Sequence, residues 1–158
     1  MDSENQTITL AVRKLKERDP QAAAEVVSFR GETTIVVPRE RLVGTAEFLK
    51  SDPELAFDFL SDITAVDRFP VEPRFEVNYH LTSLKNRARL RLKVKVTAKD
   101  AVIATVTTLW PTANWHEREI FDLMGVRFEG HPNLTRILMP DDWEGHPHRK
   151  DYPVEGYR

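Results

Sequence analysis

The sequence has 158 residues, the length of one globular domain, of which 41% are hydrophobic and 30% charged. Lys and Arg total 23 against 25 Asp and Glu, so the net charge of −2 lacks the basic excess of a general nucleic-acid-binding protein. The absence of cysteine excludes disulfides, thiolate zinc sites, cysteine-ligated iron–sulfur clusters and cysteine nucleophiles.

The N-terminal third predicts two helices and a hairpin. Its polar start has no apolar signal-peptide core, and no segment approaches the ~18 apolar residues that span a bilayer, so we expect no membrane span. Residues 9–18 predict a short helix, and residues 24–29 and 33–37 predict the two strands of a hairpin. Pro38 is typical of a first helical turn. The second helix has an apolar stripe formed by Leu42, Val43, Ala46 and Leu49.

The middle of the chain alternates strictly between apolar and polar side chains. Residues 75–81 and 90–96 both show this period of two, which indicates strands with one face in the core and one in water. The short turn near Asn86 predicts that they form an antiparallel hairpin. Residues 57–66 predict another strand, and residues 102–109 predict a third strand of the same meander.

A third helix is predicted to begin at Asn114. Asn is a favoured N-cap residue, and Glu117 three positions later makes a variant of the capping box. Gly125 stands where this helix should end. Residues 1–125 are therefore expected to form an α+β domain, an antiparallel sheet with helices packed on one face.

Beyond Gly125 neither helical nor strand periodicity continues. An irregular stretch of this length is unusual inside a compact domain, yet it is rich in aromatic and aliphatic side chains. We interpret residues 126–158 as an extended irregular C-terminal arm that lies on a surface, either that of its own domain or that of a partner subunit. The sequences FEGHP at 128–132 and WEGHP at 143–147 predict the same turn twice, with glycine supplying an unusual φ.

Four late histidines are candidate metal ligands. His116 begins the sequence HEREI, which resembles the zinc-protease motif HExxH but ends in Ile120, so the second helical ligand is missing. His131, His146 and His148 follow, two of them between Gly and Pro, where histidine more often hydrogen-bonds the backbone. We predict no metal site and keep a small His-dependent metalloenzyme as an alternative of another class.

Two charged patterns have less specific interpretations. Arg118 and Asp122 have the i, i+4 spacing of an ion pair on a helix surface, which favours a charged helix face over paired catalytic carboxylates. Residues 85–99 contain seven basic residues and no acidic one. The favoured interpretation of these basic residues is a solvated sheet face on which they pair with Glu72 and Glu76. A protein contact is the next interpretation, and RNA binding is the least favoured.

The stretch EREIFDLMGVRFEGHPNLTRILMPDDWEGHPHRKDYP, residues 117–153, resembles the signature of the C subunit of NADH:quinone oxidoreductase, which is the 30-kDa subunit of respiratory complex I. The matching positions are Glu117-Arg118-Glu119, Asp122, Gly125, Phe128, Gly130-His131-Pro132, Arg136-Ile137, Trp143 and Arg149-Lys150-Asp151-Tyr152-Pro153. Residues 74–96 are similar to the family's central hairpin, whereas residues 1–70 match only in general character. His148 stands where the family usually has Leu.

The resemblance implies a non-catalytic structural subunit in the peripheral arm of a proton-translocating NADH:quinone oxidoreductase. It implies contacts with subunits D and B, and a peripheral place on the cytoplasmic side of the bacterial inner membrane. It also implies that NADH, FMN, iron–sulfur clusters and quinone belong to other subunits. The equivalent subunit of a membrane-bound [NiFe]-hydrogenase or a related dehydrogenase is the alternative within the same superfamily.

The catalytic-looking stretch is therefore interpreted as an interface with no catalytic, cofactor-binding or metal-binding residue. Charge-assisted hydrogen bonds and aromatic anchors are expected to fix the arm on a partner. The predicted partner-binding residues are Glu117, Arg118, Glu119, Asp122, Phe128, His131, Arg136, Trp143, His146, Arg149, Lys150, Asp151 and Tyr152.

Overall fold

The computed structural model describes the backbone of residues 2–157 and the side chains of residues 4–157. Its first helix, α1, is longer than predicted and spans Asp2–Arg18. The predicted hairpin is confirmed as β1 (Glu25–Phe29) and β2 (Glu32–Val36), which pair antiparallel. A short 3-10 turn, η1 (Arg39–Arg41), then leads into α2 (Leu42–Ser51).

Three long strands form the centre of the sheet. They are β3 (Phe59–Asp67), β4 (Phe75–Ser83) and β5 (Ala88–Val96), joined as an antiparallel meander. The full strand order is β1-β2-β5-β4-β3. The α+β class is confirmed, but the sheet is not purely antiparallel, because β2 lies parallel to β5. The chain returns from β2 through α2 and two further strands before it reaches β5, which allows this parallel pairing.

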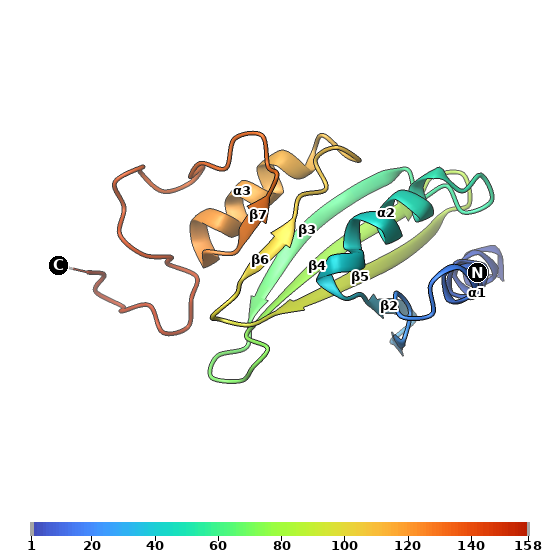
Figure 1. Ribbon diagram of the computed structural model, residues 1–158, viewed down its shortest axis with the longest axis horizontal. Coiled ribbons are helices and arrows are strands. Elements are labelled where there is room, and N and C mark those ends of the chain that lie inside the picture. Colours follow the sequence, from blue (N-terminus) through green and yellow to red (C-terminus); the bar gives the residue numbers. More distant parts are fainter. Residues whose placement is uncertain (1, 158) are drawn as a thin grey trace.

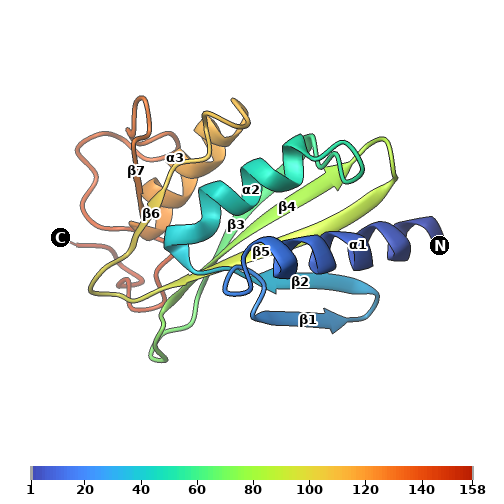
Figure 2. The same ribbon diagram turned by 45° about the vertical axis from the view of Figure 1, so that its right-hand side comes forward.

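The alternation seen in the sequence sets the register of the sheet. Val77 lies opposite Val94 and Tyr79 opposite Leu92, and all four side chains are buried. Their inward face forms one hydrophobic cluster with apolar residues of all three helices, such as Leu15, Leu49 and Ile120. The predicted packing of helices on one face is confirmed, and Figure 2 shows the helices over the same side of the sheet.

The prediction of a meander strand at residues 102–109 is wrong. Only β6 (Val102–Ala104) is a strand, and it pairs in parallel with β7 (Arg127–Glu129) in a separate two-stranded sheet. The outer meander strand is β3 instead. The chain leaves the strand conformation after Ala104 because Thr105 and Val106 hydrogen-bond the buried side chain of Glu117.

The third helix, α3, spans Ala113–Met124 and ends at Gly125, which has the left-handed φ of 75°. The predicted capping box is wrong. Thr112 is the N-cap residue and makes no side-chain cap hydrogen bond, while Asn114 lies inside the helix. The Glu117 carboxylate faces Thr105 and the Val106 N–H, so it is not free to reach back to the N-cap.

After β7, residues 130–157 form turns and bends without a helix or strand. Figure 1 shows this part of the chain looping beside α3, at the end of the molecule away from α1. Among the helices of residues 2–157, none has the length and apolar character needed to cross a membrane.

Candidate subunit interface

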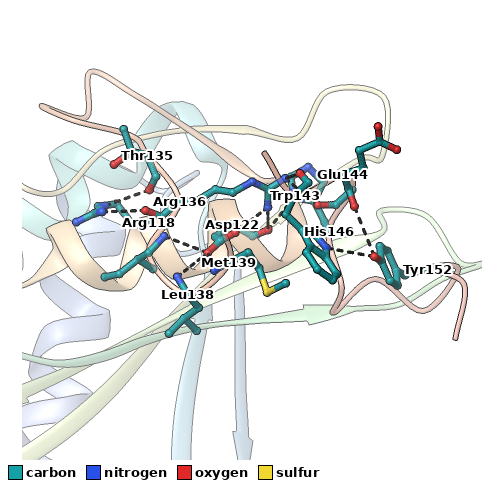
Figure 3. Close-up of polar contacts among 12 residues, drawn as sticks. Arg118, Asp122, Thr135, Arg136, Leu138, Met139, Trp143, Glu144, His146 and Tyr152 are labelled. Atoms are coloured by element: carbon teal, nitrogen blue, oxygen red, sulfur yellow. Dashed lines mark hydrogen bonds and ion pairs between the residues drawn. The ribbon is translucent and has the colours of Figure 1, made fainter. Parts of the chain in front are cut away.

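Asp122 on α3 holds the first part of the arm. Its carboxylate is fully buried, and Oδ2 accepts the backbone N–H groups of Ile137, Leu138 and Met139 at 3.0, 2.7 and 2.9 Å. Oδ1 accepts Nη1 of Arg136 at 2.7 Å (Figure 3). Burial by itself raises the pKa of the Asp122 carboxyl, but the N–H of Met139, the Arg136 guanidinium and the other two N–H groups outweigh it and lower the pKa. The side chain is therefore an anionic anchor.

The guanidinium of Arg136 joins two parts of the arm to α3. Besides the Asp122 carboxylate, it donates to the backbone oxygen of Asp122 at 3.0 Å and to those of Trp143 and Gly145 at 2.8 and 2.9 Å. The predicted ion pair between Arg118 and Asp122 is wrong. Arg118 instead donates to the carbonyls of Thr135 and Arg136 at 3.1 and 2.9 Å, because Asp122 is turned toward the arm.

The C-terminal end of α3 is covered by the second half of the arm. His146 Nδ1 lies 2.8 Å from the carbonyl oxygen of Asp122, and Arg149 Nε donates to the carbonyl of Met124 at 2.7 Å. These contacts occupy carbonyls that a helix end leaves without internal partners. Gly125 has a φ of +75°, and a Cβ there would lie 2.5 Å from Arg149 Nη2 and 2.6 Å from His146 Cδ2, so any other residue would be strained and would displace these side chains.

A second buried carboxylate holds the end of the arm to the sheet. Asp67 at the end of β3 forms a bidentate pair with Arg74, with both N···O distances 2.8 Å. The same guanidinium binds Asp151 at 2.6 and 3.1 Å, and Asp67 also accepts the backbone N–H of Lys150 at 2.8 Å. Burial raises the pKa of Asp67, but Arg74 and the backbone N–H groups of Lys150 and Phe69 dominate and hold it well below its usual range.

Glu117 has the opposite electrostatic character. Among the described residues, its buried carboxyl accepts hydrogen bonds from the Thr105 hydroxyl at 2.5 Å and the Val106 N–H at 2.8 Å, and burial raises its pKa to about 7. His131 Nε2 lies 3.9 Å away. Because the N–H of Asn133 donates to His131 Nδ1 at 3.0 Å, Nε2 carries the proton of the neutral ring.

The two Aromatic-Glu-Gly-His-Pro sequences share their glycine conformation. Gly130 and Gly145 have φ values of 80° and 79°, as predicted. Each is followed by a histidine that contacts a carbonyl of α3, since His131 Nε2 donates to Asn114 O at 3.1 Å and His146 contacts Asp122 O. The repeated motif thus joins the arm to both ends of one helix.

The remaining predicted partner-binding residues lie in different settings. Phe128 is buried in the core of the chain, and Glu119 is exposed on α3. Trp143 Nε1 donates to the Tyr152 hydroxyl at 3.2 Å, and the Tyr152 ring packs edge-on against Tyr157 at 5.3 Å. Most residues of the signature therefore already have partners within the chain.

The late histidines do not converge. No group of three or more His, Cys, Asp or Glu side chains among the described residues is placed to hold a metal ion. His116 Nδ1 lies 3.2 Å from Asp62, whereas His131 and His146 contact carbonyls of α3 as described. His148 is held through its backbone N–H, which donates to Leu123 O at 2.9 Å.

The basic residues of β5 lie on the sheet face opposite the helices. Lys93 pairs with Glu76 at 2.8 Å, as the solvated-face interpretation predicts, and Arg91 pairs with Glu32. Glu72 does not pair with this strand, because it accepts the backbone N–H groups of Arg74 and Ala98. This face therefore balances much of its own charge.

Asp67 and Arg74 are the two site residues that the sequence analysis missed. They face each other across the loop between β3 and β4, and Asp151, their third partner, is 77 residues away from Arg74 in sequence. An isolated Asp or Arg at a strand end has no distinctive pattern. The only signal was that Arg74 begins the segment similar to the family's central hairpin.

Known proteins are similar to this chain over most of its length. Residues 35–158 match the family model described as respiratory-chain NADH dehydrogenase, 30 Kd subunit. The C subunit of the NADH-quinone oxidoreductase of Geotalea uraniireducens is 50% identical over 146 residues, which cover 92% of this chain and 88% of the relative. That of Geobacter sulfurreducens is 52% identical over 147 residues, which cover 92% and 90%.

Two solved structures are also similar. The trypsin-resistant fragment of Nqo5 superposes with a TM-score of 0.67 and 34% identity, over 78% of this chain and 99% of the fragment. A chain of the membrane-bound sulfane sulfur reductase, an archaeal respiratory membrane complex, superposes with a TM-score of 0.73 and 29% identity, over 90% and 84%. With the family match over most of its length, the chain belongs to the family of the 30 Kd subunit of respiratory-chain NADH dehydrogenase.

Proposed function

We propose that this chain is a non-catalytic structural subunit in the peripheral arm of a proton-translocating NADH:quinone oxidoreductase. The observation that carries the proposal is 50% identity, over 92% of the chain, to a protein named as the C subunit of NADH-quinone oxidoreductase. The chain would support electron transfer from NADH to quinone by holding other subunits in place.

The contacts of the signature residues favour a scaffold over an active site. Catalysis needs titratable groups that can reach a substrate, and such groups commonly line a pocket. Here the carboxylates of Asp122 and Asp67 are buried and fully engaged by arginines and backbone N–H groups. These carboxylates are therefore occupied in fixing the chain's own shape.

The proposed neighbours are subunits D and B, on the cytoplasmic side of the bacterial inner membrane. The resemblance of residues 117–153 supports these assignments. NADH, FMN, iron–sulfur clusters and quinone would be bound by other subunits, since a chain without cysteine offers no thiolate ligand to a cluster.

A related respiratory complex is the second candidate. The similarity to a chain of the sulfane sulfur reductase, at 29% identity over 90% of this chain, indicates that the same fold serves complexes with other substrates. The equivalent subunit of a [NiFe]-hydrogenase or related dehydrogenase falls in this group. The identity to NADH-quinone oxidoreductase subunits is higher, which favours the first candidate.

The proposal is tested by recovering the tagged full-length chain from gently solubilised membranes of its native host and identifying its partners by mass spectrometry. We expect the quinone-site and cluster-bearing subunits together with the NADH-oxidising module. A nickel-containing large subunit without that module would support the second candidate. A chain recovered alone would contradict both.

A further inference from the structure

The loop of residues 137–144 has its polar backbone turned inward and its apolar side chains turned outward. Its first three N–H groups point at the buried Asp122 carboxylate. The side chains of Ile137, Leu138 and Trp143 are nevertheless 38%, 61% and 40% exposed. Figure 3 shows the Leu138 side chain pointing away from Asp122 while its backbone nitrogen faces it.

Apart from the hydrogen bond of Trp143 Nε1 to the Tyr152 hydroxyl, the shape of this loop is fixed by contacts that do not use those side chains. The Arg136 guanidinium bridges Asp122 to the carbonyls of Trp143 and Gly145, and the N–H of Trp143 closes a turn on Pro140 O at 3.0 Å. A rigid loop that displays apolar groups loses little conformational entropy when a partner covers them.

The same loop carries negative charge beside its apolar side chains. Asp141, Asp142 and Glu144 are exposed, and within the described part of the chain their carboxylates have no cationic partner within 4 Å. On the sheet face opposite the helices, by contrast, Glu76 and Glu32 form ion pairs with Lys93 and Arg91 of β5. Unpaired acidic groups around an apolar centre match the layout of an interface with an apolar core and a polar rim.

We propose that the 137–144 loop is the docking element of the arm, and that it fits an apolar recess bordered by Lys or Arg on another protein subunit. The inference rests on the proposed function and deepens it. The charged signature residues bind within the chain. The proposed contact with the partner subunit is therefore made by the apolar side chains that those residues hold outward. The acidic rim selects a partner of opposite charge.

The test compares incorporation of full-length variants into the complex in a strain that lacks the native chain. Leu138→Ser removes an outward side chain and leaves its N–H bond to Asp122 in place. Leu84→Ser is the matched control, because Leu84 is also 61% exposed but lies in the turn after β4. We expect recovery of Leu138→Ser with the other subunits to fall about ten-fold, and that of Leu84→Ser to be unchanged.

The charge argument is tested separately. The double variant Asp141→Lys/Asp142→Lys changes two exposed side chains whose carboxylates have no ion-pair partner among the described residues. Glu47→Lys, at an exposed position on α2, is its control. We expect the double variant to be recovered several-fold less at low salt, with a smaller deficit at high salt. Thermal unfolding of each isolated chain is measured in parallel and is expected to match the wild type.

The possible outcomes separate the two proposals. Normal recovery of both loop variants would overturn the docking inference while leaving the proposed function intact. A wild-type chain that associates with no other subunit would overturn both. A dimer of the isolated chain that Leu138→Ser dissociates would show that the loop binds a second copy, and would also overturn the inference.

Discussion

The sheet domain and the arm are held together in opposite ways. In the sheet, apolar side chains such as Tyr79 and Leu92 face each other in register and are buried with the helices. In residues 130–157, the arm's backbone N–H groups and guanidiniums bind carboxylates and carbonyls of the domain. A segment without periodicity can thus adopt a fixed shape when buried acceptors hold it.

The two regions differ in how many residues their stability depends on. A core of many apolar contacts spreads its stability over many residues. The arm depends on a few acceptors, since Asp122 alone receives three backbone N–H groups and one guanidinium. Single polar substitutions should therefore detach the arm while the sheet remains folded, and the following experiments separate the two regions.

The largest effect is expected for Asp122→Asn. The amide offers one acceptor and one donor, so its donor must face either Arg136 or the three backbone N–H groups. Leaving that buried network unsatisfied should lower the free energy of unfolding by about 3–5 kcal/mol, measured by urea denaturation. Limited trypsin digestion should then cleave at Arg136. Asp142→Asn, at an exposed position, is the control and should change neither measurement.

The stability of the contact between α3 and the segment after β6 should depend on pH through Glu117. Its folded-state pKa of about 7 lies above its ordinary 4.5, because burial outweighs the hydrogen bonds from Thr105 and Val106. The folded chain then holds a proton that the unfolded chain has released, so this stability is fully present below pH 4.5 and is lost as pH rises through 7.

Glu117→Gln should abolish that loss. The difference in unfolding free energy between variant and wild type should grow by roughly 3 kcal/mol from pH 4.5 to pH 8, measured by denaturant titration at each pH. Glu119→Gln, on the exposed face of the same helix, should show no such growth. A pH-independent difference for Glu117→Gln would mean that the carboxyl is ionised throughout.

A smaller effect is expected for Asp151→Ala, which removes one of the two carboxylates on Arg74. Asp151 is partly exposed, so the cost should be roughly 1–2 kcal/mol. We expect less assembled complex but unchanged NADH:quinone activity per assembled complex, and the same for Arg149→Ala. Glu47→Ala, at an exposed carboxylate on α2 outside this cluster, is the control. Normal assembly with lost turnover would instead point to a catalytic role.

The smallest effect is expected on the sheet face opposite the helices. The pair of Glu76 and Lys93 is half-buried on neighbouring strands. A double-mutant cycle with Glu76→Gln and Lys93→Met should give a coupling of about 0.5–1 kcal/mol, decreasing with salt. Trypsin sensitivity of the arm should not change, because this pair belongs to the sheet alone.

The regular elements were predictable because their periodicity reports directly which face is buried. Residues 75–81 and 90–96 gave the central hairpin, and Gly125 gave the end of α3. The strand predicted at residues 102–109 failed because β-rich composition does not reveal that Thr105 and Val106 serve a buried carboxylate. Local propensity could not indicate a contact made by tertiary structure.

The site was predictable in composition but not in connectivity. Asp122, Arg136, Arg149 and Asp151 stood out as charged residues in an irregular stretch, and were interpreted as contacts to another chain. The structure pairs them within the chain, through Asp67 and Arg74 among others. The sequence shows which residues can take part in a polar network. Whether their partners lie within the chain or in another chain depends on how the arm folds back onto its own domain.

The measurement that tests this account most directly is amide hydrogen exchange of the isolated full-length chain at Ile137, Leu138 and Met139. If Asp122 holds the arm against its own domain, these three N–H groups should exchange far more slowly than an unstructured chain. The protection should disappear in Asp122→Asn. Exchange at the rate of an unstructured chain in the wild type would contradict the account, because the arm would then acquire its shape only on a partner.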